Sequence, residues 1–260
     1  MSQFRRLEIN GGHVQQNLES TTSKLSILPA KNGYTNSQID DYRQSENGRS
    51  HFKWQPNTTL SLSARFSRPI SQLKGTAGFG FWNAPFGDPT VKTPAIPKAV
   101  WFFFGSQPNR LPFYKHPTEN GFIAGTIHAT RWQALRWIPF APFVLAINNI
   151  SSVKHRLWPK VQSDLGIYST LIQTNVTQWH HYKLDWGLKE CKFWLDEELI
   201  HASPVSPTGK LGFVCWIDNQ YLVATGNGRF RWGTVPITQS QTLEIADLSI
   251  KKGIKVKSKR

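Results

Sequence analysis

Residues 179–204 read WHHYKLDWGLKECKFWLDEELIHASP and contain two stretches in which side chains alternate in character. The first stretch runs from Trp179 to Trp186 and ends at Gly187. In the second, Cys191 and Phe193 alternate with polar or amphipathic residues. Successive side chains of an extended chain point to opposite faces. The segment therefore predicts a β-hairpin that is unusually rich in aromatic side chains.

Most of the remaining chain shows the same short alternating stretches, punctuated by glycine and proline. The expected strands cover residues 60–67, 77–84, 97–106, 121–130, 166–174, 209–225 and 242–252. Many short strands at regular spacing are typical of an all-β sandwich or jelly roll. The sequence predicts one jelly-roll domain over residues 21–252, preceded by an N-terminal extension (1–20) and followed by a basic tail (253–260).

One segment interrupts the strands with a helical pattern. Val144, Ile147, Ile150 and Leu157 recur at three- to four-residue spacing, which predicts a helical insertion over about residues 142–158. Pro142 suits its first turn, and Pro159 is expected to end it. Such a helix either packs as a cap on the sandwich or lies in a membrane interface. Its asparagines and serines favour the packed cap.

The order of these features resembles a known superfamily. The residues that carry the resemblance are GTAGFGFWNAPFG (75–87), DLSIKK (247–252) and, in the hairpin, Trp179, His180, Tyr182, Trp186, Trp194 and Asp196, with Glu197 where glycine is usual. Over residues 20–252 the chain resembles the concanavalin A-like lectins and glucanases, and most closely the laminarinase-type (family 16) glycoside hydrolases. The resemblance implies a concanavalin A-like jelly roll with a carbohydrate site on its concave face.

The chain departs from that family at the catalytic strand. Family 16 hydrolases carry Glu-x-Asp-x-Glu on one strand, so that alternation places all three carboxylates on the concave face. The equivalent strand here, PKAVWFFFGS (97–106), contains no carboxylate. The sequence therefore predicts a carbohydrate- or glycoconjugate-binding domain, and any enzyme built on it would not be a standard two-carboxylate glycosidase.

Two side chains are candidates for chemistry. Asp218 lies in the polar segment WIDNQYL and suits an acid or a hydroxyl acceptor; a turn at a strand end is the alternative. His128 suits a base or a hydrogen-bond donor, whereas an isolated strand histidine more commonly has a structural partner. The other candidate ligand-binding residues are Asp41, Trp82, Asn83, Phe104, Ser106, Trp216 and Gln220. Tryptophan faces stack on sugar C–H groups, and amides and carboxylates bond their hydroxyls.

An apolar ligand is the alternative to a sugar. Strand 97–106 is apolar on both faces, with Phe102 and Phe104 on one side and Trp101 and Phe103 on the other. A strand of this kind is covered on both sides. It could line an aromatic pocket for a small apolar metabolite beneath the helical insertion.

Composition limits the remaining classes. The 260 residues are 39% hydrophobic and 18% charged, with a net charge of +15, and six of the last ten residues are Lys or Arg. This favours anionic contacts, including weak peripheral contact with membranes, and leaves open an interaction protein that uses its tail. No nucleic-acid motif, metal-ligand spacing, cofactor motif or transmembrane segment is evident. Residues 1–20 hold no apolar signal segment, so the expected location is the cytoplasm.

Overall fold

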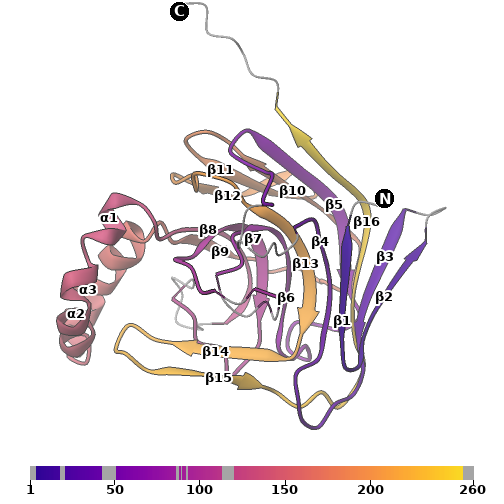
Figure 1. The fold of residues 1–260 in the computed structure, drawn as a ribbon, viewed down its shortest axis with the longest axis horizontal. Helices are drawn as coiled ribbons and strands as arrows, with labels where there is room; N and C mark the ends of the chain where they lie inside the picture. The colour runs from indigo at the N-terminus through magenta and orange to yellow at the C-terminus, as the bar shows by residue number, and fades with distance from the viewer. Residues whose placement is uncertain are drawn as a thin grey trace, which may run out of the picture.

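The computed structural model describes residues 4–17, 21–42, 51–85, 88, 90–91, 93–112 and 120–253. They form two seven-stranded antiparallel sheets, nested one inside the other (Figure 1). The inner sheet consists of β1 (Arg5–Ile9), β4 (Asn36–Asp40), β13 (Gly212–Asp218), β6 (Thr76–Trp82), β7 (Lys98–Gly105), β8 (Gly121–His128) and β9 (Tyr168–Leu171). The outer sheet consists of β12 (Glu198–Ser203), β11 (Cys191–Leu195), β10 (His180–Trp186), β5 (Thr58–Phe66), β16 (Gln241–Lys252), β3 (Thr22–Ile27) and β2 (Gly12–Asn17). The predicted jelly-roll sandwich is confirmed.

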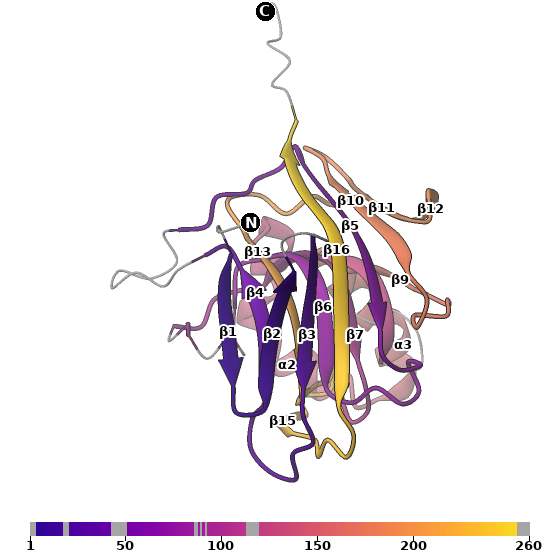
Figure 2. The same cartoon turned by 90° about the vertical axis from the view of Figure 1, so that its right-hand side faces the viewer.

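Aromatic side chains fill the space between the two sheets. Phe79 of β6 and Phe102 of β7 contact Tyr182 of β10, with ring centroids 5.1 Å apart in both pairs. Trp186 packs on Phe81 at 5.5 Å. Each fully buried side chain of this size contributes on the order of 2 kcal/mol to folding through its apolar area alone. Figure 2 shows the outer sheet that covers this core.

The predicted aromatic hairpin forms as β10 and β11, with Tyr182 opposite Leu195 and Trp186 opposite Cys191. Its inward residues belong to the main core, so it stabilises the sandwich. A second turn joins β11 to β12 through Asp196 and Glu197, whose φ angles are +48° and +70°. Two successive positive φ angles are typical of a type I′ turn, which favours glycine. Glu197 thus occupies the position where the resembled family has glycine.

The two chain ends differ from one another. The sequence predicts an extension over residues 1–20, whereas Arg5–Ile9 and Gly12–Asn17 form β1 and β2, which are edge strands of the inner and outer sheets. The jelly roll therefore begins well before residue 21. Alternation in these strands is short, which is why it gave no clear sequence signal. Of the predicted basic tail, residues 254–260 lie outside the described residues.

The helical insertion follows β8 and is broken into short pieces: α1 (Trp132–Leu135), a 3-10 turn (Ile138–Phe140), α2 (Ala141–Ile147) and α3 (Ser151–Asp164). The prediction of a single helix ending at Pro159 is wrong, because Pro159 lies inside α3. The helix continues because its last turn is anchored: Val161 and Gln162 are buried, and the Gln162 amide donates to Pro112 O at 2.7 Å. No helix in the described part of the chain is both long and apolar enough to span a membrane.

One face of the inner sheet packs against the main core, and the opposite face is concave (Figure 1). The hairpin of β14 (Gln220–Ala224) and β15 (Phe230–Thr234) lies at one margin of this face. The helical insertion lies beyond the tip of this hairpin, at the left of Figure 1. A second hydrophobic cluster occupies the concave face, with Trp101, Phe103 and Trp216 among its members. This concave face is where the resemblance places a ligand.

Candidate functional site

Four aromatic side chains form a platform on the concave face: Trp82, Trp101, Phe103 and Trp216. The indoles of Trp82 and Trp216 are stacked, with centroids 5.9 Å apart and planes 5° from parallel. Trp101 touches both rings, at 6.1 Å and 5.7 Å. Trp101 and Trp216 are buried, whereas Trp82 is half-buried. Trp82 is therefore the part of the platform that a ligand can reach.

Glycines in β6 make room for this platform. A Cβ at Gly78 would clash with Phe102 O and lie 3.1 Å from the Trp216 ring. A Cβ at Gly80 would lie 2.6 Å from Trp101 Cα. Side chains at these positions would lift both indoles off the sheet. The alternating glycines of TAGFGFW therefore let the tryptophans of neighbouring strands lie across β6.

A polar row borders the platform along β4. Asn36, Gln38 and Asp40 occupy alternate positions, and Ile39 between them points into the main core. Gln38 is opposite Trp216 on β13, so the row and the platform share one face. The Arg5 guanidinium holds Asp40 with two nitrogens, at 3.0 Å and 2.6 Å. Arg5 is 25% exposed in its side chain and marks the open edge of the row.

A chain of hydrogen bonds links the row to Trp82. The Gln38 amide donates to Asp40 at 2.8 Å and to Asp88 at 3.3 Å. The Tyr42 hydroxyl donates to Asp88 at 2.7 Å and accepts from the Trp82 indole N–H at 2.9 Å. The orientation of the reachable indole is thus set by buried carboxylates. A bonded network of this kind holds its members in one geometry.

Burial controls the charge of this network. Desolvation raises the pKa of the Asp40 carboxyl, although the bonds from Arg5 oppose that shift. Burial, together with the nearby Asp88 and Asp40, raises the pKa of the Tyr42 phenol well above its usual value. Tyr42 therefore stays protonated and remains a hydrogen-bond donor across the physiological range.

The Asn36 side chain differs from its neighbours in the row. It is fully buried, and neither its amide nitrogen nor its amide oxygen hydrogen-bonds to any described residue. Leaving a buried amide unpaired costs roughly 1–3 kcal/mol. Asn36 faces Asp218 across the β4–β13 ladder, beside Gln38 and Trp216. A buried amide without a partner calls for an explanation, and this one lies on the same face as the tryptophan platform.

Asp218 adjoins this site at the end of β13. One of its oxygens accepts from the backbone N–H and hydroxyl of Thr76, at 3.2 Å and 2.7 Å, and from Gln220 N–H at 3.0 Å. Burial raises its pKa to about 6 despite these bonds. The Trp216 indole N–H also donates to the Thr76 hydroxyl, at 3.0 Å. Asp218 thereby ties β13 to β6 and fixes the inner ring of the stacked pair.

His128 is not near Asp218. The register pairs His128 with Lys98 at one end of β7, whereas Asp218 is level with Gly105 at the other end. Seven residues of extended strand separate the two levels, which is about 23 Å. Burial, with Lys98 and Arg131 nearby, lowers the pKa of His128 to about 4. His128 is therefore a neutral imidazole next to Thr208, and it does not act with Asp218.

Three other predicted ligand residues hold backbone in place. Asn83 accepts from Lys98 N–H at 2.8 Å and donates to Ile96 O at 2.9 Å. The Ser106 hydroxyl accepts from Gly75 N–H and donates to Gln107 O, each at 2.9 Å. Gln220 donates its backbone N–H to Asp218. These contacts shape the rims of the concave face.

Two predicted residues face away from the concave side. Phe104 points into the main core with Phe102, and the residues of β7 that reach the concave face are Trp101 and Phe103. The expectation that Phe104 lines a pocket beneath the helical insertion is therefore wrong. Asp41 accepts from the Trp54 indole and from Phe213 N–H, so its neighbour Asp40 is the acid in the polar row. The pattern NSQIDDY could have indicated this, because Gln38 and Asp40 alternate with the apolar Ile39.

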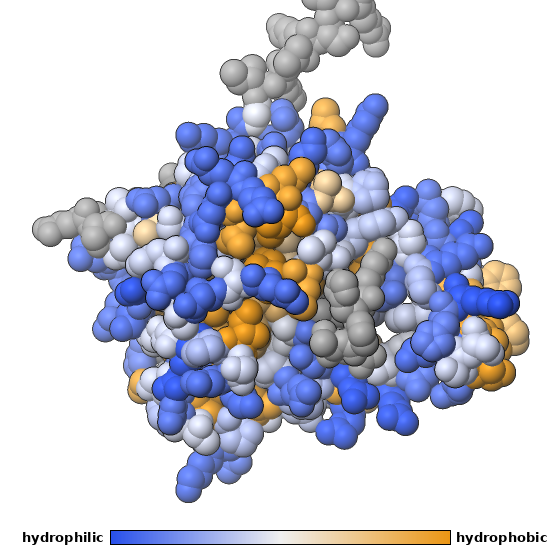
Figure 3. All heavy atoms as spheres, turned by 180° about the vertical axis from the view of Figure 1, so that it is seen from behind, coloured by the Kyte–Doolittle hydropathy of each residue, from blue (hydrophilic) through white to orange (hydrophobic). Residues whose placement is uncertain are grey.

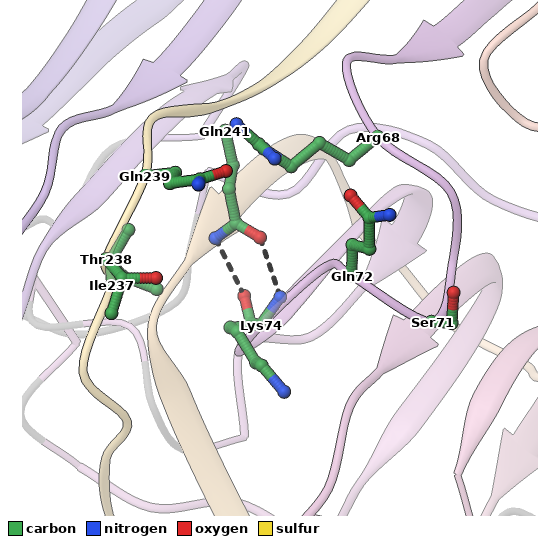
Figure 4. Close-up of a pocket in the computed structure, with 8 residues that line it drawn as sticks. All are labelled: Arg68, Ser71, Gln72, Lys74, Ile237, Thr238, Gln239 and Gln241. Atoms are coloured by element: carbon green, nitrogen blue, oxygen red, sulfur yellow. Dashed lines mark hydrogen bonds between the residues drawn. The ribbon is translucent and has the colours of Figure 1, made fainter.

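A separate hollow of about 370 Å³ lies between the β5–β6 connection and the segment before β16 (Figure 4). Its lining residues are Arg68, Ser71, Gln72, Lys74, Ile237, Thr238, Gln239 and Gln241. The Gln241 amide is bonded to both backbone groups of Lys74. This lining has no aromatic face, so the concave side of the inner sheet is the stronger candidate. In the described part of the chain, no three His, Cys, Asp or Glu side chains are grouped to hold a metal ion.

Comparisons with known proteins agree on the fold. No protein-family model and no curated protein sequence matches the chain. Among solved structures, it is similar to the carbohydrate recognition domain of Emp47p, with a TM-score of 0.50 and 10% identity over 98% of this chain and 90% of that one. The Crh5 transglycosylase has a TM-score of 0.49 at 8% identity, over 98% and 79% of the two chains. The similarity to the Emp47p domain agrees with the jelly-roll sandwich that the two sheets form.

Proposed function

We propose that the protein binds a carbohydrate on the concave face of its inner sheet, between the half-buried Trp82 and the polar row of β4. The observation that carries this proposal is the buried Asn36 amide, which has no hydrogen-bond partner among the described residues and lies next to the tryptophan platform. A lectin-type fold makes this face the natural place for the ligand, although fold by itself does not define function.

Sugars match both halves of the site. A pyranose has an apolar C–H face, which stacks on an indole such as Trp82, and an edge of hydroxyl groups, which bond amides and carboxylates. Gln38 and Asp40 lie on the same face as the platform, and because both are buried a sugar stacked on Trp82 contacts them once the side chains over the row move aside. Asn36 supplies an amide donor and an amide acceptor at the deep end of the row.

A neutral glycan is the expected ligand class. The site holds three buried carboxylates, those of Asp40, Asp88 and Asp218. The described cation in the polar network is Arg5, which is already paired with Asp40 at 2.6 Å. An acidic sugar would meet these carboxylates in a medium where charge repulsion is strong. The net charge of +15 is therefore a property of other surfaces.

Binding without hydrolysis is the expected activity. The concave-face positions of β7 are Ala99, Trp101 and Phe103, where the resembled hydrolases carry carboxylates. Asp40 accepts hydrogen bonds from Arg5 and Gln38. Asp88 accepts hydrogen bonds from Tyr42 and Gln38. Glycoside hydrolysis uses two carboxyl groups on either side of the scissile bond, one as the acid and the other as the nucleophile or the base that activates water. Asp40 and Asp88 are buried and bonded within the network, so neither is placed for such a role.

The test combines a glycan array with calorimetry and one pair of matched variants. Asn36→Leu removes the unpaired amide at nearly constant volume, so binding is lost while the free energy of unfolding rises by about 1 kcal/mol or more. Thr35→Val is the control: Thr35 is also fully buried with an unpaired hydroxyl, so its change stabilises the fold and leaves binding intact.

The expected ligands are neutral oligosaccharides, with sialylated and uronic-acid glycans bound weakly. Reducing-sugar release from any glycan that binds is expected to stay at background. The proposal fails if no neutral glycan binds, or if Asn36→Leu binds as well as the unchanged chain.

A further inference from the structure

Exposed apolar side chains gather at one end of the molecule. Of the thirteen large hydrophobic residues that are exposed in the described chain, eight lie in the helical insertion or on β15. They are Trp132, Ile138, Phe140, Phe143, Leu145, Ile150, Phe230 and Trp232, exposed by between 37% and 76%. We call these residues, together with the exposed Arg229 and Arg231 beside them, the apolar–basic surface. Hydrophobic spheres are visible next to hydrophilic ones at the right-hand edge of Figure 3, where the insertion lies.

Packing joins the helical insertion and the β14–β15 hairpin into one unit. The Asn148 amide donates to Gly226 O at 2.9 Å, and Gly226 lies against the Trp158 ring. A Cβ at Gly228 would lie 3.7 Å from Leu145. On the hairpin, the Phe230 and Trp232 rings pack together at 5.4 Å and remain exposed. The exposed residues of both elements are therefore held in a fixed relation.

The charge of this unit is strongly one-sided. Residues 131–164 and 220–234 contain seven Lys and Arg residues and a single acid, Asp164. Asp164 is already paired with Arg136 at 2.6 Å. Arg229 and Arg231 alternate with Phe230 and Trp232 on an exposed strand. A second copy of this chain would bring the same positive charges to the contact, which disfavours self-association through this surface.

We infer that the apolar–basic surface docks on an anionic lipid bilayer. Tryptophan and phenylalanine insert at the level of the lipid headgroups, and arginine and lysine meet the lipid phosphates. Each cation near an anionic leaflet adds to the attraction. The two exposed faces, one helical and one hairpin, contact the bilayer without any segment crossing it. This proposal is independent of the glycan site.

Co-sedimentation with lipid vesicles tests the proposal on the full chain. The protein is expected to bind vesicles that contain phosphatidylserine and not those of phosphatidylcholine alone, and to be released by salt. The double variant Phe230→Ser with Trp232→Ser is expected to weaken binding by about tenfold, because it removes the inserted aromatics. A second variant, Arg229→Glu with Arg231→Glu, is expected to weaken it similarly and to reduce its salt dependence, because five other Lys and Arg residues of the unit remain.

The matched control is Leu188→Ser, since Leu188 is 74% exposed in the turn between β10 and β11. Its vesicle binding should equal that of the unchanged chain. Full-strength binding by both hairpin variants would overturn the proposal, because the surface that it names includes the hairpin. Equal binding to neutral and anionic vesicles, or none to either, would also overturn it. So would sedimentation showing that the variants abolish a dimer instead.

Discussion

The indole rings of Trp82 and Trp216 lie parallel, 5.9 Å apart, although the two residues are not partners in the β6–β13 ladder: Trp82 is opposite Gly212, and Trp216 is opposite Gly78. The stack is possible because β6 has no side chain at Gly78, under the Trp216 ring. Trp216 is anchored through Thr76, and Trp82 through Tyr42. The candidate site therefore depends on two glycines and two hydrogen bonds as much as on the rings themselves.

Gly78→Ala is expected to lower the free energy of unfolding by roughly 1–3 kcal/mol, because the new methyl group clashes with Phe102 O and displaces Trp216. The near-ultraviolet circular dichroism of the stacked indoles should fall as well. Gly11→Ala is the comparison, since its Cβ would meet the exposed Leu28 side chain at 3.1 Å and should be tolerated better. Equal losses in the two variants would contradict the packing described.

Asp218→Asn is expected to change how stability depends on pH. Burial raises the Asp218 pKa to about 6 in the folded protein, above its value in the unfolded chain. The folded state then binds the proton more tightly, so this group favours folding below about pH 4, and that contribution is lost as pH rises through 6. Asparagine keeps the acceptor oxygen and has no proton to lose.

Urea unfolding at pH 4.5 and 7.5 measures this difference. Relative to the unchanged chain, Asp218→Asn should gain about 2 kcal/mol between the two pH values, since one pKa unit corresponds to about 1.4 kcal/mol and most of the interval between the two pKa values is crossed. Groups such as His128 titrate in both proteins and cancel. A constant difference between the proteins at both pH values would count against a buried, ionised Asp218.

Glu197→Gly is expected to stabilise the fold by about 1 kcal/mol, because a left-handed backbone costs a side-chain-bearing residue about that much. Glu197 has φ +70° in the β11–β12 turn. Glu198→Gly, one residue later and inside β12, should do the opposite, since glycine weakens a strand. Thermal unfolding of the two variants should show shifts of opposite sign.

Both cysteine thiols are expected to be unreactive in the folded protein. Burial raises the pKa of Cys191 to about 12 and also raises that of Cys215, and neither is disulfide-bonded. An aromatic disulfide reagent should modify neither thiol under native conditions and both in denaturant, because the thiolate is the reactive form. Rapid reaction of one thiol in the native protein would show that its sheet opens locally.

Alternation along single strands was sufficient to predict the fold class. The hairpin of residues 179–204, the two-sided burial of strand 97–106 and the two candidate tryptophans followed from period-two patterns, which are local. The helix was harder to place. Its apolar spacing predicts a buried face, but of the residues that define that spacing only Val144 is buried, and Ile150 is exposed. An amphipathic pattern indicates a helix without saying what covers it.

The site itself required contacts between distant segments. Asp40 and Asp41 are equivalent in the sequence, and the packing of Ile39 into the core decides which acid reaches the concave face. Similarly, β7 is apolar on both faces, so alternation pairs Phe102 with Phe104 without saying which face holds the ligand. Asp88 joins Tyr42 and Gln38 across long loops. Local pattern sets which side chains share a face of one strand, whereas the identity of neighbouring strands and the side that faces the core come from packing the whole chain, and those two choices create the site.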